Sequence, residues 1–238
     1  EVFEPLGIPA KDADVALFWD FPCLHQKPRR EGEIELFKEG LISSNVWYGH
    51  ANTVVWIQPE LPPANRAAGS ATYEESGWCF TEASMSSVLT KQENLLDLSR
   101  RNHRKEVWWR HDNGPKYLFQ YWCRLGRRTT PVPERMARVL QTEKTFTNGG
   151  DMALVSKLYR NFFDSVAPCI DGIDRQDLKW GDTEVKMLAE AMPLLPNCRY
   201  LWLQMNKCSG AGAAALSDVL CSHPALEVLC FGGQVYLP

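Results

Sequence analysis

A repeat of 28 residues near the C-terminal end constrains this 238-residue chain more than any other feature of its sequence. Residues 198–203 (CRYLWL) align with residues 226–231 (LEVLCF), and both segments alternate as short strands do. The same offset relates further apolar positions: Leu201 to Leu229, Leu203 to Phe231, Leu188 to Leu216 and Met192 to Leu220. Each unit is therefore predicted to be a strand, a turn (206–212 in the second unit) and an amphipathic helix. One such unit cannot cover its own apolar face, so neighbouring units must stack.

The period and the pattern resemble leucine-rich repeats of the ribonuclease-inhibitor type, over roughly the last sixty residues. The resemblance implies a short αβ solenoid at residues 169–238 that binds a protein partner rather than doing chemistry. Because only about two units are visible, we expect the array to lean on the domain before it or to continue beyond Pro238 in a longer chain. The alternative is two unrelated αβ units with coincidental spacing.

The N-terminal part is predicted to be an α/β domain. Two apolar runs, residues 14–20 (DVALFWD) and 53–57 (TVVWI), are each typical of a strand buried on both faces. A helix is expected after each run, at residues 31–48 and around residues 78–89. The first of these helices has an apolar stripe made of Ile34, Phe37, Leu41 and Tyr48. Strand, helix, strand and helix in this order favour a parallel sheet with flanking helices.

Two more helices are predicted within residues 131–163, joined at a turn over residues 147–150. The mixed, polar pattern of residues 91–126 predicts no particular element. We therefore expect three parts: an α/β domain at residues 1–128, a helical connector at residues 129–168 and the repeats at residues 169–238.

Composition and charge exclude several classes of protein. The chain is 45% hydrophobic, enough for a sizeable core, and its formal net charge of −3 argues against bulk attraction to nucleic acid or anionic membranes. No apolar run approaches the roughly 20 residues that cross a bilayer. The eight cysteines form no CxxC pair and lack zinc-ligand spacing, so we expect reduced, buried thiols in a cytoplasmic protein without a structural metal site. Because the first residue is Glu1 and not methionine, we expect a fragment or a trimmed product.

Three other segments carry a second resemblance. Residues 73–82 (YEESGWCFTE) are similar to the Y-x-x-S-x-W-C-x-x-E segment of Toll/interleukin-receptor (TIR) domains. Residues 17–26 (LFWDFPCLHQ) and 46–57 (VWYGHANTVVWI), with an acidic helix between them, resemble fungal heterokaryon-incompatibility (HET) domains, which are thought to be distant TIR relatives. Over residues 14–90, the resemblance implies a TIR-like or flavodoxin-like fold. The first strand of that fold would precede Asp14, where the chain is too short and too broken by proline to supply it.

The TIR resemblance also implies a chemistry. In the enzymatic members of the family, the glutamate of this motif cleaves NAD, and the matching residue is Glu82. Breaking the bond between ribose and nicotinamide builds positive charge on the ribose ring, which a nearby carboxylate stabilises much as in glycoside hydrolysis. NAD would be a substrate rather than a resident cofactor, and the residues expected to contact it are Asp20, Gln26, Ser76 and Trp78.

Plainer roles are open for the same residues, since one fold hosts many functions. Glu82 is alternatively a solvated helix carboxylate, Trp78 a core residue and Asp20 the cap of a loop. The sequence thus leaves two functions. The first is a signalling or self-recognition module that binds or cleaves NAD and recognises a protein through its repeats. The second is a non-enzymatic interaction scaffold in which the α/β domain self-associates.

Three further patterns in the sequence have simpler structural explanations. Basic residues with interleaved tryptophans at residues 100–110 could grip a nucleic acid, but such a cluster is more often a solvated helix edge, and neither nucleic acid nor a membrane is an expected partner. The spacing gives no support to a dyad of Cys79 with a histidine. Residues 210–212 (GAG) are a corner of the repeat and not a phosphate loop, because a third glycine and an acidic partner are lacking.

Overall fold

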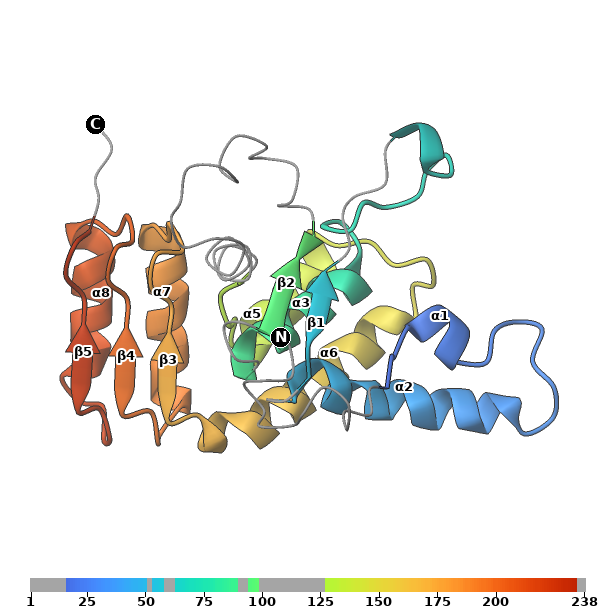
Figure 1. Ribbon diagram of the computed structural model, residues 1–238, viewed down its shortest axis with the longest axis horizontal. Helices are drawn as coiled ribbons and strands as arrows, with labels where there is room; N and C mark the ends of the chain where they lie inside the picture. The colour runs from blue at the N-terminus through green and yellow to red at the C-terminus, as the bar shows by residue number, and fades with distance from the viewer. Residues whose placement is uncertain (1–15, 51–52, 58–62, 90–93, 99–126, 235–238) are drawn as a thin grey trace, which may run out of the picture. The chain divides into compact units, whose positions relative to one another are not determined.

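The computed structural model (Figure 1) describes residues 16–50, 53–57, 63–89, 94–98 and 127–234. These residues form helices and two small parallel sheets, which places the chain in the α/β class. The chain divides into two compact units, Glu1–Trp47 and Tyr48–Pro238, and each is described by itself. The division into three parts expected from the sequence stays a prediction.

The first unit contains a short helix and most of a long one. Helix α1 spans Asp20–Cys23, and α2 spans Glu33–Gly49, which confirms the helix predicted at residues 31–48. The predicted apolar stripe on α2 is only partly covered, since Ile34 is 46% exposed. At Phe37 the ring lies under the guanidinium of Arg29, with 3.6 Å between Cζ and the ring centroid.

The strand predicted at residues 14–20 is wrong over its described part. Residues 16–19 form no strand, and Asp20 begins α1 instead. The backbone of Trp19 is engaged locally, because its N–H donates to Cys23 Sγ (3.3 Å) and its C=O accepts from the N–H of Cys23 (2.9 Å). The N–H and C=O of Trp19 are therefore not available to pair with a neighbouring strand. Leu17 and Trp19 are also 76% and 62% exposed, unlike residues of a buried strand.

A two-stranded parallel sheet opens the second unit. Strand β1 (Val55–Ile57) pairs with β2 (Leu95–Asp97), and α3 (Gly77–Leu89) forms the connection between them, after a 3-10 turn at Pro63–Asn65. The predicted strand at residues 53–57 and the helix after it are confirmed. The sheet is parallel as expected, but its second strand is β2 and not the run at residues 14–20. The partner strand β2 lies where the sequence predicted no element, and β1 is not buried on both faces, since Trp56 is 58% exposed.

Two further helices pack with α3 around a common core. Helix α5 spans Pro133–Thr142 and α6 spans Asp151–Val166, as predicted for two helices separated by a turn. Among the described residues, the largest fully buried side chain is Tyr159 of α6, whose hydroxyl donates to the carbonyl oxygen of Pro131 (2.7 Å). A 3-10 turn at Ala167–Cys169 then leads into the C-terminal module.

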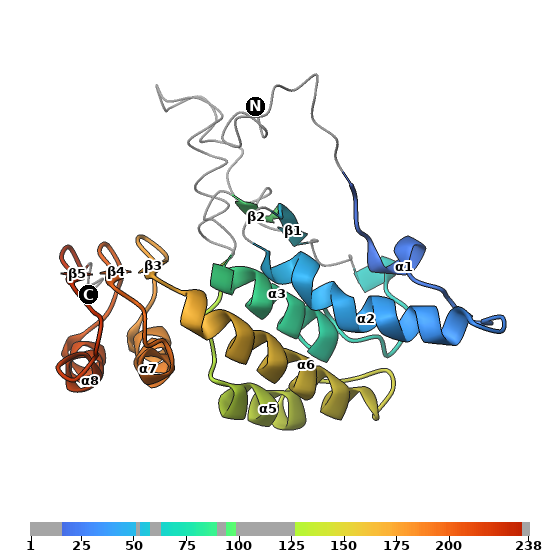
Figure 2. The ribbon, with the colours of Figure 1, turned by 90° about the horizontal axis from the view of Figure 1, so that it is seen from below.

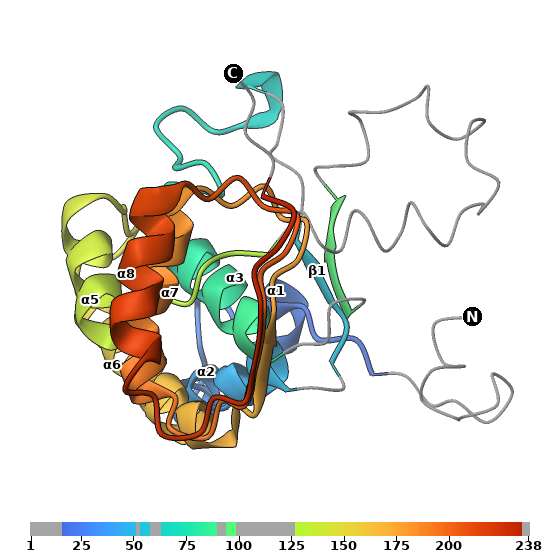
Figure 3. The ribbon, with the colours of Figure 1, turned by 90° about the vertical axis from the view of Figure 1, so that its left-hand side faces the viewer.

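The C-terminal module repeats a strand followed by a helix on the far side. Its elements are β3 (Gly172–Asp174), α7 (Asp182–Ala191), a 3-10 turn (Met192–Leu194), β4 (Tyr200–Trp202), α8 (Gly210–Leu220) and β5 (Val228–Cys230). The three strands are parallel in the order β3-β4-β5, and both helices cover one face of their sheet (Figure 2). Viewed along the array, the strands superpose and so do the helices (Figure 3).

The strand register confirms the 28-residue offset. Leu201 pairs with Leu229 as aligned from the sequence, and Ile173 pairs with Leu201, which adds a third strand at the same spacing. Leu201 is fully buried toward the helices, whereas Leu229 on the outermost strand is 45% exposed. An inward position is therefore buried where another unit stacks beyond it, as at Leu201, and stays partly exposed on the outermost strand.

One buried amide fixes the turn between β4 and α8. The side chain of Asn206 is fully buried and makes four hydrogen bonds to the backbone. Its Oδ1 accepts from the N–H groups of Leu178 and Trp180 (both 3.0 Å), and its Nδ2 donates to the carbonyl oxygens of Arg175 (2.7 Å) and Leu203 (2.9 Å). The amide thus ties its own turn to the turn of the preceding unit.

Gln234, 28 residues after Asn206, repeats most of this pattern. Its Nε2 donates to the carbonyl oxygens of Leu203 (2.9 Å) and Phe231 (3.0 Å), and its Oε1 accepts from the N–H of Cys208 (3.1 Å). Each of these partners lies 28 residues after a partner of Asn206. The spacing is therefore held by polar groups as well as by apolar side chains.

A carboxylate of one unit occupies the N-terminal end of the next helix. Asp182 Oδ1 accepts from the backbone N–H groups of Ser209 (2.7 Å) and Gly212 (3.2 Å), at the start of α8. Hydrogen bonds from Ser209 hold the pKa of Asp182 below its usual value. A side chain at Gly212 would collide with Cys208 and Asp182, so this close approach requires glycine. The corner at residues 210–212 therefore already holds an anionic group supplied by the chain.

Seven cysteines fall in the described residues, all of them as free thiols. Cys198 and Cys208 are buried, and burial raises the pKa of each thiol to about 11. The expectation of buried thiols is wrong for Cys23, Cys169 and Cys221, which are exposed because they follow or end short elements at the surface.

We predict that Asn206→Ala lowers the free energy of unfolding by about 3 kcal/mol or more, because several buried backbone groups lose their partner at once. Chemical denaturation measures the change. Asn197→Ala is the matched control: this exposed amide makes one hydrogen bond, to Pro168, and its loss should cost less than about 1 kcal/mol. Equal effects of the two substitutions would contradict the bracing role of Asn206.

Candidate functional site

The segment that resembles the TIR motif surrounds the start of α3. Ser76 lies just before the helix, and its Oγ accepts from the N–H of Cys79 (3.4 Å), as an N-cap does. A parallel bridge joins Ser76 to Thr145, with Gly77 N–H donating to the carbonyl oxygen of Thr145 (3.0 Å). The sequence-predicted contact residue Ser76 is therefore held in place by the loop between α5 and α6.

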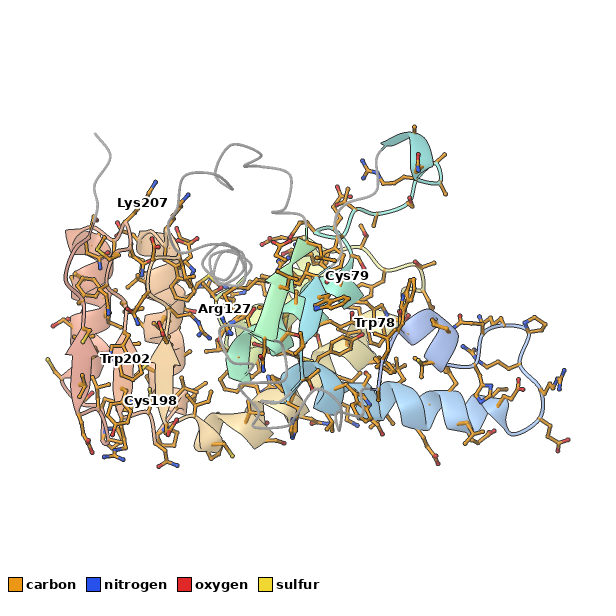
Figure 4. All side chains as sticks on the ribbon, viewed as in Figure 1. Trp78, Cys79, Arg127, Cys198, Trp202 and Lys207 are labelled. Carbon is orange, nitrogen blue, oxygen red and sulfur yellow. The ribbon has the colours of Figure 1, made fainter. Side chains whose placement is uncertain are left out.

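Trp78 points from α3 to the start of α6. Its indole Nε1 donates to Asp151 Oδ2 (3.2 Å), and the ring packs against the main hydrophobic core. Figure 4 labels Trp78 and the neighbouring Cys79 on α3. This geometry gives Trp78 a bracing role between two helices, one of the plainer roles that the sequence left open.

Glu82 lies half-buried on α3, one turn after Trp78. Tyr73 reports its surroundings: burial raises the pKa of the Tyr73 hydroxyl above its usual value, and the nearby Cys79 and Glu82 raise it further. Cys79 and Glu82 of the motif are therefore both close enough to Tyr73 to act on its hydroxyl electrostatically. The region therefore contains a carboxylate and a phenol whose raised pKa keeps it protonated.

Cations and an aromatic ring border this group of motif residues. Arg128 forms an ion pair with Glu74 and lies over the ring of Phe80, 5.1 Å from its centroid. The ammonium of Lys144 lies 4.1 Å from the same centroid and donates to the carbonyl oxygen of Glu74 (2.8 Å). Both cations therefore lie against Phe80 on α3 and contact Glu74 of the motif.

The two remaining sequence-predicted contact residues belong to the first compact unit. Asp20 is exposed at the start of α1, and its carbonyl oxygen accepts from the N–H of Leu24 (2.9 Å). Gln26 is exposed as well, and its Nε2 donates to the carbonyl oxygen of Leu24 (3.0 Å). Because Asp20 opens a helix, it does not end a strand as the sequence predicted.

A second candidate surface is the face of the β3–β5 sheet that the helices leave open. The sequence patterns did not predict it as a site. On β4, the rings of Tyr200 and Trp202 stack with 5.6 Å between centroids and 6° between planes. Both side chains are half-buried, while Leu201 between them is fully buried. Successive side chains of a strand point to opposite faces. The same alternation that predicts inward positions for Leu201 and Leu203 therefore predicts outward positions for Tyr200 and Trp202.

Polar pairs join adjacent units across this face. Arg199 donates from Nε and Nη2 to the two carboxylate oxygens of Glu227, both at 2.8 Å, which lowers the pKa of Glu227. Farther along the strands, Gln204 Nε2 donates to Gln176 Oε1 (2.5 Å). The members of each pair are 28 residues apart, so the repeat places equivalent positions of neighbouring units side by side.

The structure does not test the remaining sequence patterns that were considered as sites. The basic cluster at residues 100–110 and Cys123 lie outside the described residues. Within the described part of the chain, no group of three or more His, Cys, Asp or Glu side chains could hold a metal ion. None of the helices described is both long and apolar enough to cross a membrane.

Comparison with known proteins finds no matching family model, no matching curated protein and no matching solved structure. The function of the chain therefore has to be argued from its own residues and geometry.

We predict that Trp78→Phe lowers the free energy of unfolding by about 1–2 kcal/mol, because the indole donor to the Asp151 carboxylate is lost while most of the apolar contact remains. Thermal or chemical denaturation measures the change. Trp56→Phe is the matched control, since this exposed indole should contribute little. A Trp78→Phe protein as stable as the wild type would leave the bracing role without support.

Proposed function

We propose that this chain is a signalling or self-recognition module whose 28-residue repeats bind a protein partner through the open face of the β3–β5 sheet. The observation that carries the proposal is the repeated parallel register, with helices on one face and half-buried aromatic rings on the other. Strand, turn and helix in units of 28 residues are typical of leucine-rich repeats of the ribonuclease-inhibitor type. Repeat arrays of this kind use one extended surface for binding.

The composition of the open face supports protein recognition. Tyr and Trp are enriched where proteins bind one another, because they offer a large apolar area with a polar tip. The stack of Tyr200 on Trp202 is ordered before any partner arrives, which limits the entropy lost on binding. Hydrogen bonds of the buried Asn206 side chain hold the turns that follow β3 and β4, next to this surface.

We predict that a photo-crosslinking phenylalanine analogue at position 202 forms covalent adducts with a protein partner in extracts of the source cells, because it replaces one large aromatic group on the open face by another. The matched control carries the same analogue at Asp218, an exposed position on α8. Mass spectrometry of the adducts identifies the partner. Adducts of equal yield at both positions, or none at position 202, would exclude the open face as the binding surface.

The second candidate function is cleavage of NAD by Glu82, for which the TIR resemblance supplies the reaction. It is favoured by the half-buried position of Glu82 on α3, near Tyr73, another residue of the motif, whose pKa is raised by burial and then by the charges of Cys79 and Glu82. A half-buried carboxylate can stabilise positive charge developing on a ribose ring. The alternative for the same region is a non-enzymatic scaffold that self-associates.

We predict, for the enzymatic alternative, that the protein releases nicotinamide from NAD and that Glu82→Gln lowers the rate by at least about 100-fold, since the charge that stabilises the transition state is removed. Chromatographic assay of nicotinamide measures the rate. Glu143→Gln, an exposed carboxylate at the end of α5, is the control and should keep full activity. If no nicotinamide appears even when the protein is forced to oligomerise, the scaffold alternative holds.

A further inference from the structure

The open face of the repeat sheet contains a column of stacked planar groups. The guanidinium of Arg199 lies 5.1 Å from the centroid of the Tyr200 ring, and that ring stacks on Trp202. Figure 4 shows Trp202 on β4, between Cys198 toward one end of the module and Lys207 toward the other. The column shows that this face accepts a guanidinium against an aromatic ring.

The cation of this column is already neutralised. Arg199 makes two hydrogen bonds to the carboxylate of Glu227, so a bidentate pair occupies both groups. Trp202, at the other end of the column, has no cation over its ring among the described residues. A second guanidinium can therefore extend the column only at Trp202.

A carboxylate stands beside Trp202 at the middle of the face. Asp174 on β3 is the register partner of Trp202 on β4, and paired residues of parallel strands project to the same side of a sheet. Asp174 Oδ1 accepts from the backbone N–H of Gln176 (3.1 Å), and the carboxylate makes no ion pair within the described part of the chain.

Arg175, the next residue along the chain, forms no ion pair with this carboxylate. Arg175 turns inward, where its guanidinium donates to the backbone carbonyl oxygens of Asp174 (2.7 Å) and Ser87 (2.5 Å). Lys179 and Lys207 follow the strands, in the turns that lead to the helices. Burial lowers the pKa of Arg175 and the charge of Asp174 raises it, but the two side chains form no ion pair. The middle of the face therefore combines an aromatic ring with an acidic group that forms no ion pair among the residues described.

We propose that Trp202 and Asp174 form a docking site for an arginine side chain in an extended segment of the protein that the repeats bind. The planar guanidinium stacks on the indole while its N–H groups donate to the Asp174 carboxylate. Arginine satisfies both groups at once, because its donors lie in the plane that stacks, whereas a lysine ammonium is a point charge. The inference rests on the proposed binding function of this face and names the chemistry of the partner.

Three synthetic peptides test the inference with the whole chain. Each is a short, extended serine–valine peptide with one central residue, which is arginine, lysine or the neutral arginine analogue citrulline. Calorimetric titration should show the arginine peptide binding about three- to tenfold more tightly than either of the others, as expected for a cation over an aromatic ring with a carboxylate beside it. Equal affinity for the arginine and citrulline peptides, or for the arginine and lysine peptides, would overturn the proposal.

Two substitutions localise the effect. Asp174→Asn keeps the oxygen that accepts from Gln176, so the fold is retained, and it should reduce binding of the arginine peptide to the level of the citrulline peptide. Trp202→Leu should also weaken the arginine peptide, with circular dichroism confirming that the protein remains folded. Asp218→Asn on α8 is the matched control and should bind as the wild type does. An unchanged preference for arginine in Asp174→Asn would refute the site.

The outcomes separate this inference from the function on which it rests. Crosslinking of a partner at position 202 without any preference among the peptides would end the arginine proposal and leave the binding function in place. The opposite outcome is a preference for arginine that Asp174→Asn removes, together with no crosslinked partner. That outcome would establish the site and end the proposed function.

Discussion

The buried amide of Asn206 is the interaction on which the repeat module depends. The strands are only three residues long, so their own hydrogen bonds cannot hold the turns that follow them. Backbone N–H and C=O groups of two successive turns would be buried without partners, and one side chain satisfies four of them. Once the turns are fixed at this spacing, Leu201 faces the helices and Trp202 faces outward.

A second buried polar contact connects the repeats to α3. Arg175, next to Asp174, donates to the carbonyl oxygen of Ser87 in the last turn of α3, and Arg127 donates to the same oxygen (3.2 Å). Burial, and then the charge of Arg127, lower the pKa of Arg175 to about 9, so the group stays protonated near neutral pH. Cations at the C-terminal end of a helix are favoured by its dipole. The first repeat thus contacts the helix that carries Glu82.

Sequence patterns located most helices and the spacing of the repeated strands. They failed where tertiary contacts determine whether a segment forms a strand and which way a side chain points. The run at residues 14–20 has a strand-like composition, but the backbone of Trp19 bonds locally to Cys23. Strand β2 is three residues in a polar stretch, too short for a periodic signal, and its burial comes from packing against β1 and α3. Trp78 and Glu82 share a helix as expected, yet Trp78 is directed to Asp151, 73 residues away along the chain.

The sequence by itself determined the 28-residue period, the inward leucines and the helices, because these depend on neighbours within a few residues along the chain. Only the tertiary structure decided that Asp174 stands beside Trp202, that Arg199 is neutralised by Glu227 and that Asn206 binds two turns. The physical reason is that a side chain's partners come from segments far apart in the sequence. Their identity depends on how strands and helices stack, and no local pattern records that.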